Sequence, residues 1–275
     1  NAGYSIGTAA NQNYIYRLNN IGRNITAWTS TGVLTDPAIT AAVNQKFNSA
    51  TNDAVSDLAL FPDGRVLIGF NSGILQIYAA NLATRSYSGE PVTMDTLNSV
   101  AIKDDNSFYA GGRVAAAVPT GQIPGANIGP DAAYAGGTLG LEGVIIRYSS
   151  STTTPAPDWA TYIGGSGDEY FTAIDMTPDK TNLVFAATTA VAGTYPALVN
   201  AVDATIVGTT ELLVGVLSDG AAKPSAFSVF SYLGGDTAEG SLSNATTAAV
   251  VTAADSYFYV AGNTNSAAAS MPGIT

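Results

Sequence analysis

The sequence predicts an all-β fold built from four-stranded antiparallel sheets. The main observation is a repeated unit, YIGGSGDEYFTAIDMTPDKTNLVFAA at residues 162–187, whose pattern returns in YLGGDTAEGSLSNATTAAVVTAADSYFYVAGNTNS at residues 232–266. In both copies a β-rich run ends in Tyr-aliphatic-Gly-Gly, a small acidic turn follows, and two apolar runs flank a polar turn. Short β-rich runs bounded by turn residues also continue along the rest of the chain. A repeating unit made of strands predicts a repeat architecture.

The expected strands fall into two alternating types, with four of each. One type is a hairpin with a polar turn, centred near Asp63, Asp105, Asp179 and Asp255. In its clearest case Pro62 presets one turn dihedral and Gly64 accepts the positive one. The other type is a strand pair with a more variable turn, beginning near residues 14, 74, 144 and 212. In chain order the expected strands lie at residues 14–18, 25–30, 55–61, 65–70, 74–78, around Tyr87, in a hairpin at 99–112, at 144–148 and 159–163, in a hairpin after Tyr162, at 212–217 and 226–233, and in a hairpin at 247–262.

Two segments do not follow the strand pattern. Asp36-Pro37 followed by AITAAVNQKF predicts either a short helix that begins after an Asp cap or a surface loop with one helical turn. Residues 113–140 are too rich in Gly, Pro and Ala for regular structure. A long ordered loop of this kind is either functional or an excursion packed on its own sheet.

The order of the two types predicts a β-propeller, in which a ring of four-stranded blades leaves few strand edges exposed. The chain starts with the second type and stops with the first, so hairpin 247–262 is expected to join strands 14–30 in one blade. Pairing with the first strands of a neighbouring molecule would instead build a head-to-tail fibre, but effective concentration favours closure within one chain. We expect one domain over residues 1–275, with blades at 247–275 plus 1–30, 54–90, 97–163 and 170–233.

Charged residues make up only 11% of the chain, which predicts a surface rich in Ser, Thr, Asn, Gln and Gly. The net charge of −11 argues against nucleic-acid partners and anionic membranes. No apolar run approaches the roughly 18 residues of a membrane-spanning helix. The chain begins with Asn1 and carries sequons at Asn24 and Asn244, so we expect a mature, glycosylated product in an extracellular or cell-surface location.

The repeat units resemble two families of propeller repeat. YIGGSGDEYFTAIDM and YLGGDTAEG, each followed by a hairpin ending in FAATT or VAGNT, are similar to the SBBP class of bacterial β-propeller repeat. The stretch from IYRLNNIG to SDLALFPDGRVLIGF is similar to the delta-60 type. The match departs from the pattern at residues 235–238, and the first two blades lack the Gly-Gly element. The resemblance implies a secreted or envelope propeller of bacteria or archaea, with no catalytic set to transfer.

Four carboxylates are candidate ligands for Ca²⁺, the cofactor we consider. Asp168 and Glu169 follow the first Gly-Gly, and Asp236 and Glu239 follow the second. Hard oxygen ligands of this kind suit Ca²⁺, which takes six to eight of them. The alternative is that Asp and Gly are simply the residues that such turns require.

Nothing in the sequence selects a catalytic set. The chain has no His and no Cys, which removes the commonest general base and all thiolate chemistry. A glycosidase needs two carboxylates at a defined separation, and the sequence singles out no pair. Trp28, Trp159 and the Tyr residues could stack on sugars, but aromatic strand residues more often pack between blades.

These observations favour a non-catalytic structural or adhesive module. We expect it to bind other copies of itself or cell-surface polymers, and to assemble into an extracellular filament or layer. A carbohydrate-binding or calcium-dependent propeller is the alternative, and a glycan-active enzyme is the least favoured of the three.

Overall fold

The computed structural model describes an all-β chain, as the sequence predicts. Within the described residues there is no helix, and therefore none that could cross a membrane. The described residues are 2–6, 13–17, 43–47, 54–80, 84–104, 106–118, 122, 129–137, 139–150, 154–190, 198–207, 209–219, 223–240, 248–254 and 257–266.

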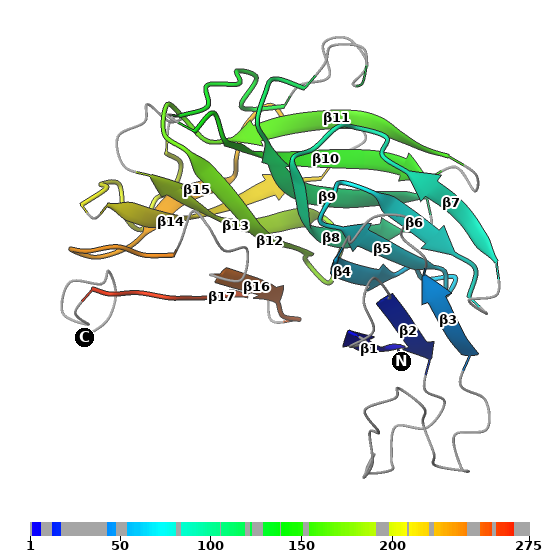
Figure 1. Cartoon of the computed structure of the whole chain (residues 1–275). Coiled ribbons are helices and arrows are strands. Elements are labelled where there is room, and N and C mark those ends of the chain that lie inside the picture. Colours follow the sequence, from blue (N-terminus) through cyan, green and yellow to red (C-terminus); the bar gives the residue numbers. More distant parts are fainter. Residues whose placement is uncertain are drawn as a thin grey trace.

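Three four-stranded antiparallel sheets form the centre of the molecule, and each is a meander of consecutive strands. Such a sheet is the blade of a β-propeller, and Figure 1 shows the blades following one another along an arc in chain order. We name them blades A, B and C. Blade A contains β4 (Val55–Leu60), β5 (Val66–Phe70), β6 (Leu75–Tyr78) and β7 (Arg85–Gly89); blade B contains β8 (Thr96–Asp104), β9 (Ser107–Val114), β10 (Glu142–Ser150) and β11 (Pro155–Ile163); blade C contains β12 (Glu169–Met176), β13 (Asn182–Ala190), β14 (Thr210–Ser218) and β15 (Val229–Leu233).

Two smaller sheets lie at the ends of the described chain. β1 (Ala2–Ile6), β2 (Asn13–Arg17) and β3 (Val43–Phe47) form a three-stranded sheet, and β16 (Ala248–Thr252) and β17 (Phe258–Gly262) form a two-stranded sheet. The composite blade expected from both chain ends is therefore not formed by the described strands. β2 already pairs with β1 on one edge and β3 on the other, which leaves it no edge for β17. That residues 1–275 make one domain stays a prediction.

A second correction concerns the segment after Asp36-Pro37. Its described part, VNQKF, is strand β3 and not the end of a helix or of a loop. Pairing with β2 over the five residues of β3 outweighs the weak helical signal, because local propensity is readily overridden by sheet partners. The expected strand at residues 25–30 lies outside the described residues.

The hairpin around Pro62 has the predicted geometry. Gly64 adopts a positive φ of 89°, and its N–H donates to the carbonyl oxygen of Phe61 at 2.9 Å. The side chain of Asp63 accepts the N–H of Arg65 at 3.0 Å, which closes the turn. β4 and β5 therefore pair as the predicted hairpin.

Blade B is buried on both faces because the side chains of its strands alternate between two cores. On β10, Val144 and Ile146 join the core shared with blade A, whereas Ile145 joins the core shared with blade C. Phe171 and Phe185 of blade C stack at 6.2 Å between ring centroids in this second core. The blades thus pack face to face, as the blades of a propeller do.

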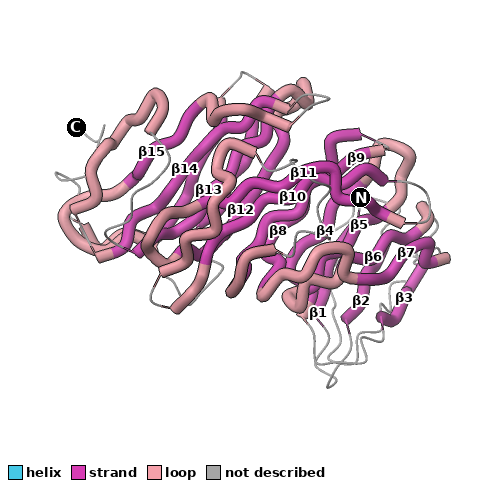
Figure 2. The backbone as a smooth tube through the Cα atoms, turned by 90° about the horizontal axis from the view of Figure 1, so that it is seen from above, coloured by secondary structure: helices cyan, strands magenta, loops and turns pink. Residues whose placement is uncertain are grey.

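The first strands of successive blades are joined by hydrogen bonds at the inside of the arc (Figure 1). The carboxylate of Asp57 on β4 accepts the Ser99 hydroxyl at 2.8 Å and the Val100 N–H at 2.9 Å, both on β8. Ser99 in turn accepts the N–H of Ile174 on β12 at 3.3 Å. Figure 2 shows the same radial arrangement from above. The innermost strands therefore form a continuous seam between blades.

The loops between second and third strands cover the outer edges of blades B and C. In blade B the Tyr162 N–H donates to the carbonyl oxygen of Asp131 at 3.1 Å. In blade C the Tyr232 N–H donates to the carbonyl oxygen of Asp203 at 3.2 Å. The described part of residues 113–140 beyond β9 has no regular structure, as predicted. It contacts its own blade through Asp131 and the start of blade C through Leu139, whose N–H donates to Asp168.

Candidate functional site

The first candidate site is a pair of glutamates at the junction of blades B and C. Glu142 begins the third strand of blade B, Glu169 begins the first strand of blade C, and both are fully buried. Gly164 of the Tyr-Ile-Gly-Gly motif packs against them. A methyl group at this position would overlap the carboxylate of Glu169 and lie 3.0 Å from Cγ of Glu142. The glycine is required by this close approach.

The same arrangement recurs one blade later. Glu211 is the second residue of the third strand of blade C, and a methyl group at Gly234 would overlap its carboxylate. Glu239 stands where Glu169 stands in the earlier junction. The N–H of Glu239 donates to the carbonyl oxygen of Thr210 at 3.0 Å, just as the N–H of Glu169 donates to that of Leu141 at 3.1 Å. Both acceptor residues directly precede the third-strand glutamate.

Glu169 and Glu239 each also accept a threonine hydroxyl. Thr189 donates to Oε1 of Glu169 at 2.9 Å, and Thr264 donates to Oε1 of Glu239 at 3.0 Å. The hydroxyl of Ser266 contacts the same oxygen of Glu239. The Tyr-aliphatic-Gly-Gly repeat in the sequence thus encodes a repeated buried pair of carboxylates.

Backbone N–H groups of the covering loop compensate part of the charge of Glu142. Its Oε2 accepts the N–H of Ala135 at 2.6 Å and that of Gly136 at 3.1 Å. Its Oε1 is buried and has no hydrogen-bond partner among the described residues. Burial raises the pKa of Glu142 to about 7, and the charge of nearby Asp131 adds to the effect. Burial likewise raises the pKa of Asp131 to about 6.

The predicted calcium ligands divide between the two junctions. Asp168 is buried, and its carboxylate accepts the N–H groups of Leu139 at 2.9 Å and Leu141 at 3.2 Å. When the two Tyr-aliphatic-Gly-Gly repeats are aligned, Glu239 takes the position of Glu169. Asp236, which is exposed, takes the position of Ser166 and not that of Asp168.

No group of three or more Asp or Glu residues in the described ranges has the geometry to hold a metal ion. The calcium site stays a prediction, and the sequons at Asn24 and Asn244 lie outside the described residues.

The sequence analysis missed Glu142 and Glu211. A signal was present, because each directly precedes a strongly apolar third strand, GVII or LLVG, in a chain with few charges. A charged residue at the start of a strand normally lies in solvent, which is why the signal was not interpreted as a buried pair.

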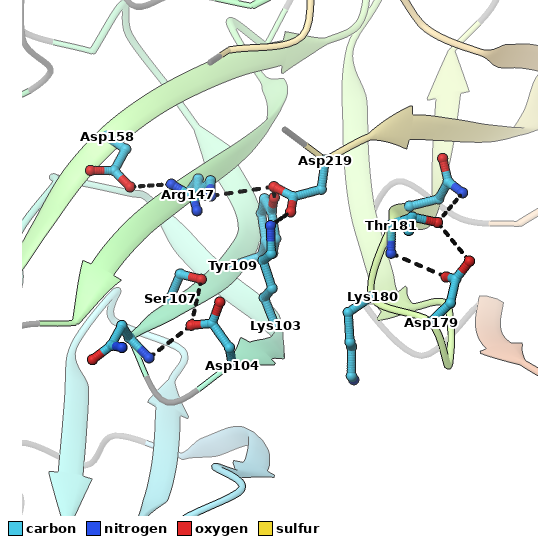
Figure 3. Close-up of polar contacts among 12 residues, drawn as sticks. Lys103, Asp104, Ser107, Tyr109, Arg147, Asp158, Asp179, Lys180, Thr181 and Asp219 are labelled. Atoms are coloured by element: carbon cyan, nitrogen blue, oxygen red, sulfur yellow. Dashed lines mark hydrogen bonds and ion pairs between the residues drawn. The ribbon is translucent and has the colours of Figure 1, made fainter. Parts of the chain in front are cut away.

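A second cluster of charges lies near the opposite ends of these strands (Figure 3). The buried carboxylate of Asp219, just after β14, contacts the Lys103 ammonium and the Tyr109 hydroxyl of blade B. The Nε atom of Arg147 lies 3.4 Å from Oδ1 of Asp219, and the same guanidinium pairs with Asp158. Burial and the Arg147 charge lower the pKa of Lys103. One blade C carboxylate is thus held by three side chains of blade B.

The buried aromatic residues of the described part serve packing, whereas Tyr257 and Tyr259 are exposed. Trp159, a candidate for sugar stacking, is 2% exposed and meets Tyr109 edge to face at 5.7 Å between ring centroids. Trp28 lies outside the described residues. Trp159 is therefore not available to a sugar in this structure.

Both charged clusters are built into the contacts between blades. The paired glutamates can hold a proton or position loop N–H groups, but neither carboxylate of the pair reaches solvent. The Asp219 cluster neutralises its buried carboxylate with two cations. What the geometry provides is attachment of one blade to the next.

No protein-family model matches the chain, and no curated protein matches its sequence. Neither the SBBP nor the delta-60 resemblance is therefore confirmed. Among solved structures, the chain is similar to the β-propeller domain of Cps50 (Swd1) from Myceliophteria thermophila, with a TM-score of 0.42 and 8% identity. The alignment covers 83% of this chain and 54% of that one, so the chain spans about half the length of the structure it matches. The blades of the chain itself carry its assignment to the all-β propeller class.

Proposed function

We propose that this protein is a non-catalytic structural module, secreted or at the cell surface, that works by binding other copies of itself or a surface polymer. The observation that carries the proposal is the two-stranded sheet β16–β17. It has half the strands of blades A, B and C, and no described strand pairs with the outer edge of β17. Incomplete sheets with an available edge are sites at which proteins add strands from a partner.

The residue types of the chain support a role without catalysis. The full sequence contains neither His nor Cys. The carboxylates of the two junctions accept structural hydrogen bonds, for example Asp168 from the N–H of Leu139 and Glu239 from the hydroxyl of Thr264. A carboxylate engaged in this way contributes to packing between blades.

The composition supports the proposed location. Only 11% of residues are charged, and the repeat units resemble those of SBBP-type and delta-60-type propellers, which implies secretion. A surface of low charge and many hydroxyl groups suits dense packing of identical subunits, because few like charges then meet.

Imaging of the protein as isolated from its source tests the proposal. Negative-stain microscopy is expected to show associated copies, as filaments, layers or discrete oligomers, and isolated single molecules at every concentration would contradict self-association. A screen of chromogenic glycosides is expected to show no turnover. Turnover that is abolished by one carboxylate substitution would contradict the non-catalytic part.

A further inference from the structure

The hairpin β16–β17 is the structural equivalent of β12–β13, the inner half of blade C. The glutamate and threonine that bond across the start of each hairpin correspond, Glu169 with Thr189 and Glu239 with Thr264. Counting back from these threonines, Tyr259 on β17 corresponds to Val184 on β13. The hairpin therefore has the strands that begin a blade without the strands that complete one.

In blade C these positions are covered. Val184 is 1% exposed, and Ala186 is fully buried in a core with Ala248 of β16. On the hairpin β16–β17, which we call the half-blade, the corresponding face is open. Tyr259 is 55% exposed, and so is Val251, its cross-strand partner on β16. β17 thus presents an apolar face as well as an available edge.

Among the described residues, no loop covers the outer edge of β17 as loops cover the outer edges of blades B and C. There the covering loops bond to the outermost strands through Asp131 and Asp203. No charged residue and no Pro lies in β17, and the sequence from 256 to 275 carries no charge at all. Charge, Pro and covering loops are the usual means of blocking strand addition.

The sequence of β17 is complementary to itself. Antiparallel pairing of FYVAG with a second FYVAG, centred on Val260, places Phe258 opposite Gly262 and Tyr259 opposite Ala261. Each aromatic ring would then lie over the small residue of the other strand, a favourable cross-strand combination. The two acidic chains would meet through a segment without like charges.

We propose that β17 pairs antiparallel with β17 of a second copy about a two-fold axis at Val260. The two hairpins then form one four-stranded sheet, β16-β17-β17-β16, with the strand count of a complete blade. The inference rests on the proposed function, since it names the self-association surface and its partner. A two-fold axis is also the commonest symmetry of protein dimers.

Cross-linking tests the register directly, because the natural chain has no cysteine. Opposed residues of an antiparallel pair have Cα atoms about 4.5–5.5 Å apart, within the range that a disulfide spans. Val260→Cys is expected to oxidise to a covalent dimer, and a mixture of Tyr259→Cys with Ala261→Cys is expected to give the mixed dimer. Val207→Cys, at an exposed position on the covering loop of blade C, is the matched control and should give no covalent dimer on oxidation.

A charge test separates this inference from the proposed function. Tyr259→Glu places a carboxylate in the paired segment and is expected to weaken dimerisation about tenfold or more by sedimentation equilibrium. Val207→Glu adds the same charge at a side chain that is 62% exposed, and this variant should dimerise as strongly as wild type. A wild-type protein that stays monomeric contradicts the self-association in the proposed function and with it the inference. If the wild-type protein does associate, two results would overturn the inference alone. One is a Tyr259→Glu protein that associates as strongly as wild type, and the other is a Val260→Cys protein that forms no cross-link.

Discussion

The carboxylate of Asp175 on β12 accepts the backbone N–H of Thr252 on β16 at 2.8 Å and the hydroxyl of the same residue at 3.0 Å. Asp57 on β4 makes the same kind of contact to β8, with Ser99 and Val100 as donors. A first-strand aspartate thus joins blade A to blade B, and another joins blade C to the half-blade. The position of the half-blade, and of the edge it presents, depends on Asp175.

Replacing Asp175 is expected to loosen the half-blade. Asp175→Ala leaves the N–H of Thr252 without its acceptor, and a loss of this kind costs about 1–3 kcal/mol. Hydrogen exchange should speed up in β16 and β17 while β5 stays protected. Asp179→Ala, in the exposed turn of the same hairpin, is the control and should not change exchange in β16. Equal exchange in β16 of wild type and Asp175→Ala would contradict the account.

Removing the charge of Asp219 is expected to destabilise the contact between blades B and C. Asp219→Asn leaves Lys103 and Arg147 without their shared buried partner, and breaking a buried ion pair costs about 3–5 kcal/mol. Urea unfolding measures the loss. Asp63→Asn breaks the surface pair with Arg65 and should cost at most about 1 kcal/mol. Equal losses in the two variants would contradict the structural role of Asp219.

A methyl group at either junction glycine is expected to destabilise the protein. In Gly164→Ala it overlaps the carboxylate of Glu169, and in Gly234→Ala that of Glu211. Forcing an extra methyl group into a packed site costs about 1–3 kcal/mol. Thermal unfolding of both variants should show similar losses because the sites are equivalent. A neutral effect at both would show that the glutamates move aside freely.

The buried Glu142 is expected to make stability depend on pH. Burial raises its pKa from 4.5 to about 7, so the folded protein binds this proton more tightly than the unfolded chain does. The resulting stabilisation is complete below pH 4.5 and is lost as the pH rises through about 7. Glu142→Gln cannot ionise, so its melting temperature should fall less over this interval. Parallel pH profiles of wild type and variant would contradict the shifted pKa.

The blades were predictable from the sequence because each hairpin carries its own local signals. Pro62 and Gly64 mark one turn and Asp104 another, and the apolar runs beside them have the length of strands. Strand β3 was not predictable, since its pairing with β2 is decided by tertiary contact and Asp36-Pro37 indicated a helix. The composite blade of hairpin 247–262 with strands 14–30 is likewise not formed by the described strands. The sequence contains no signal for which strand takes the edges of β2.

The candidate site was only half predictable. The Gly-Gly motif marked Glu169 and Glu239 through repetition, but their partners Glu142 and Glu211 lie about 30 residues earlier in the chain. Only the fold brings the start of a third strand beside the start of the next blade. The contacts of Asp219 with Lys103 and Tyr109 join residues more than 100 positions apart in the sequence and leave no local pattern.

Hydrogen exchange of residues 258–262 as a function of protein concentration tests the central claim most directly. If β17 is the edge at which copies meet, its amides should be poorly protected in dilute protein and become protected as the concentration rises, while the amides of β13 exchange equally slowly throughout. Exchange in β17 that is the same at every concentration, in a protein that nevertheless associates, would contradict the assignment of this edge.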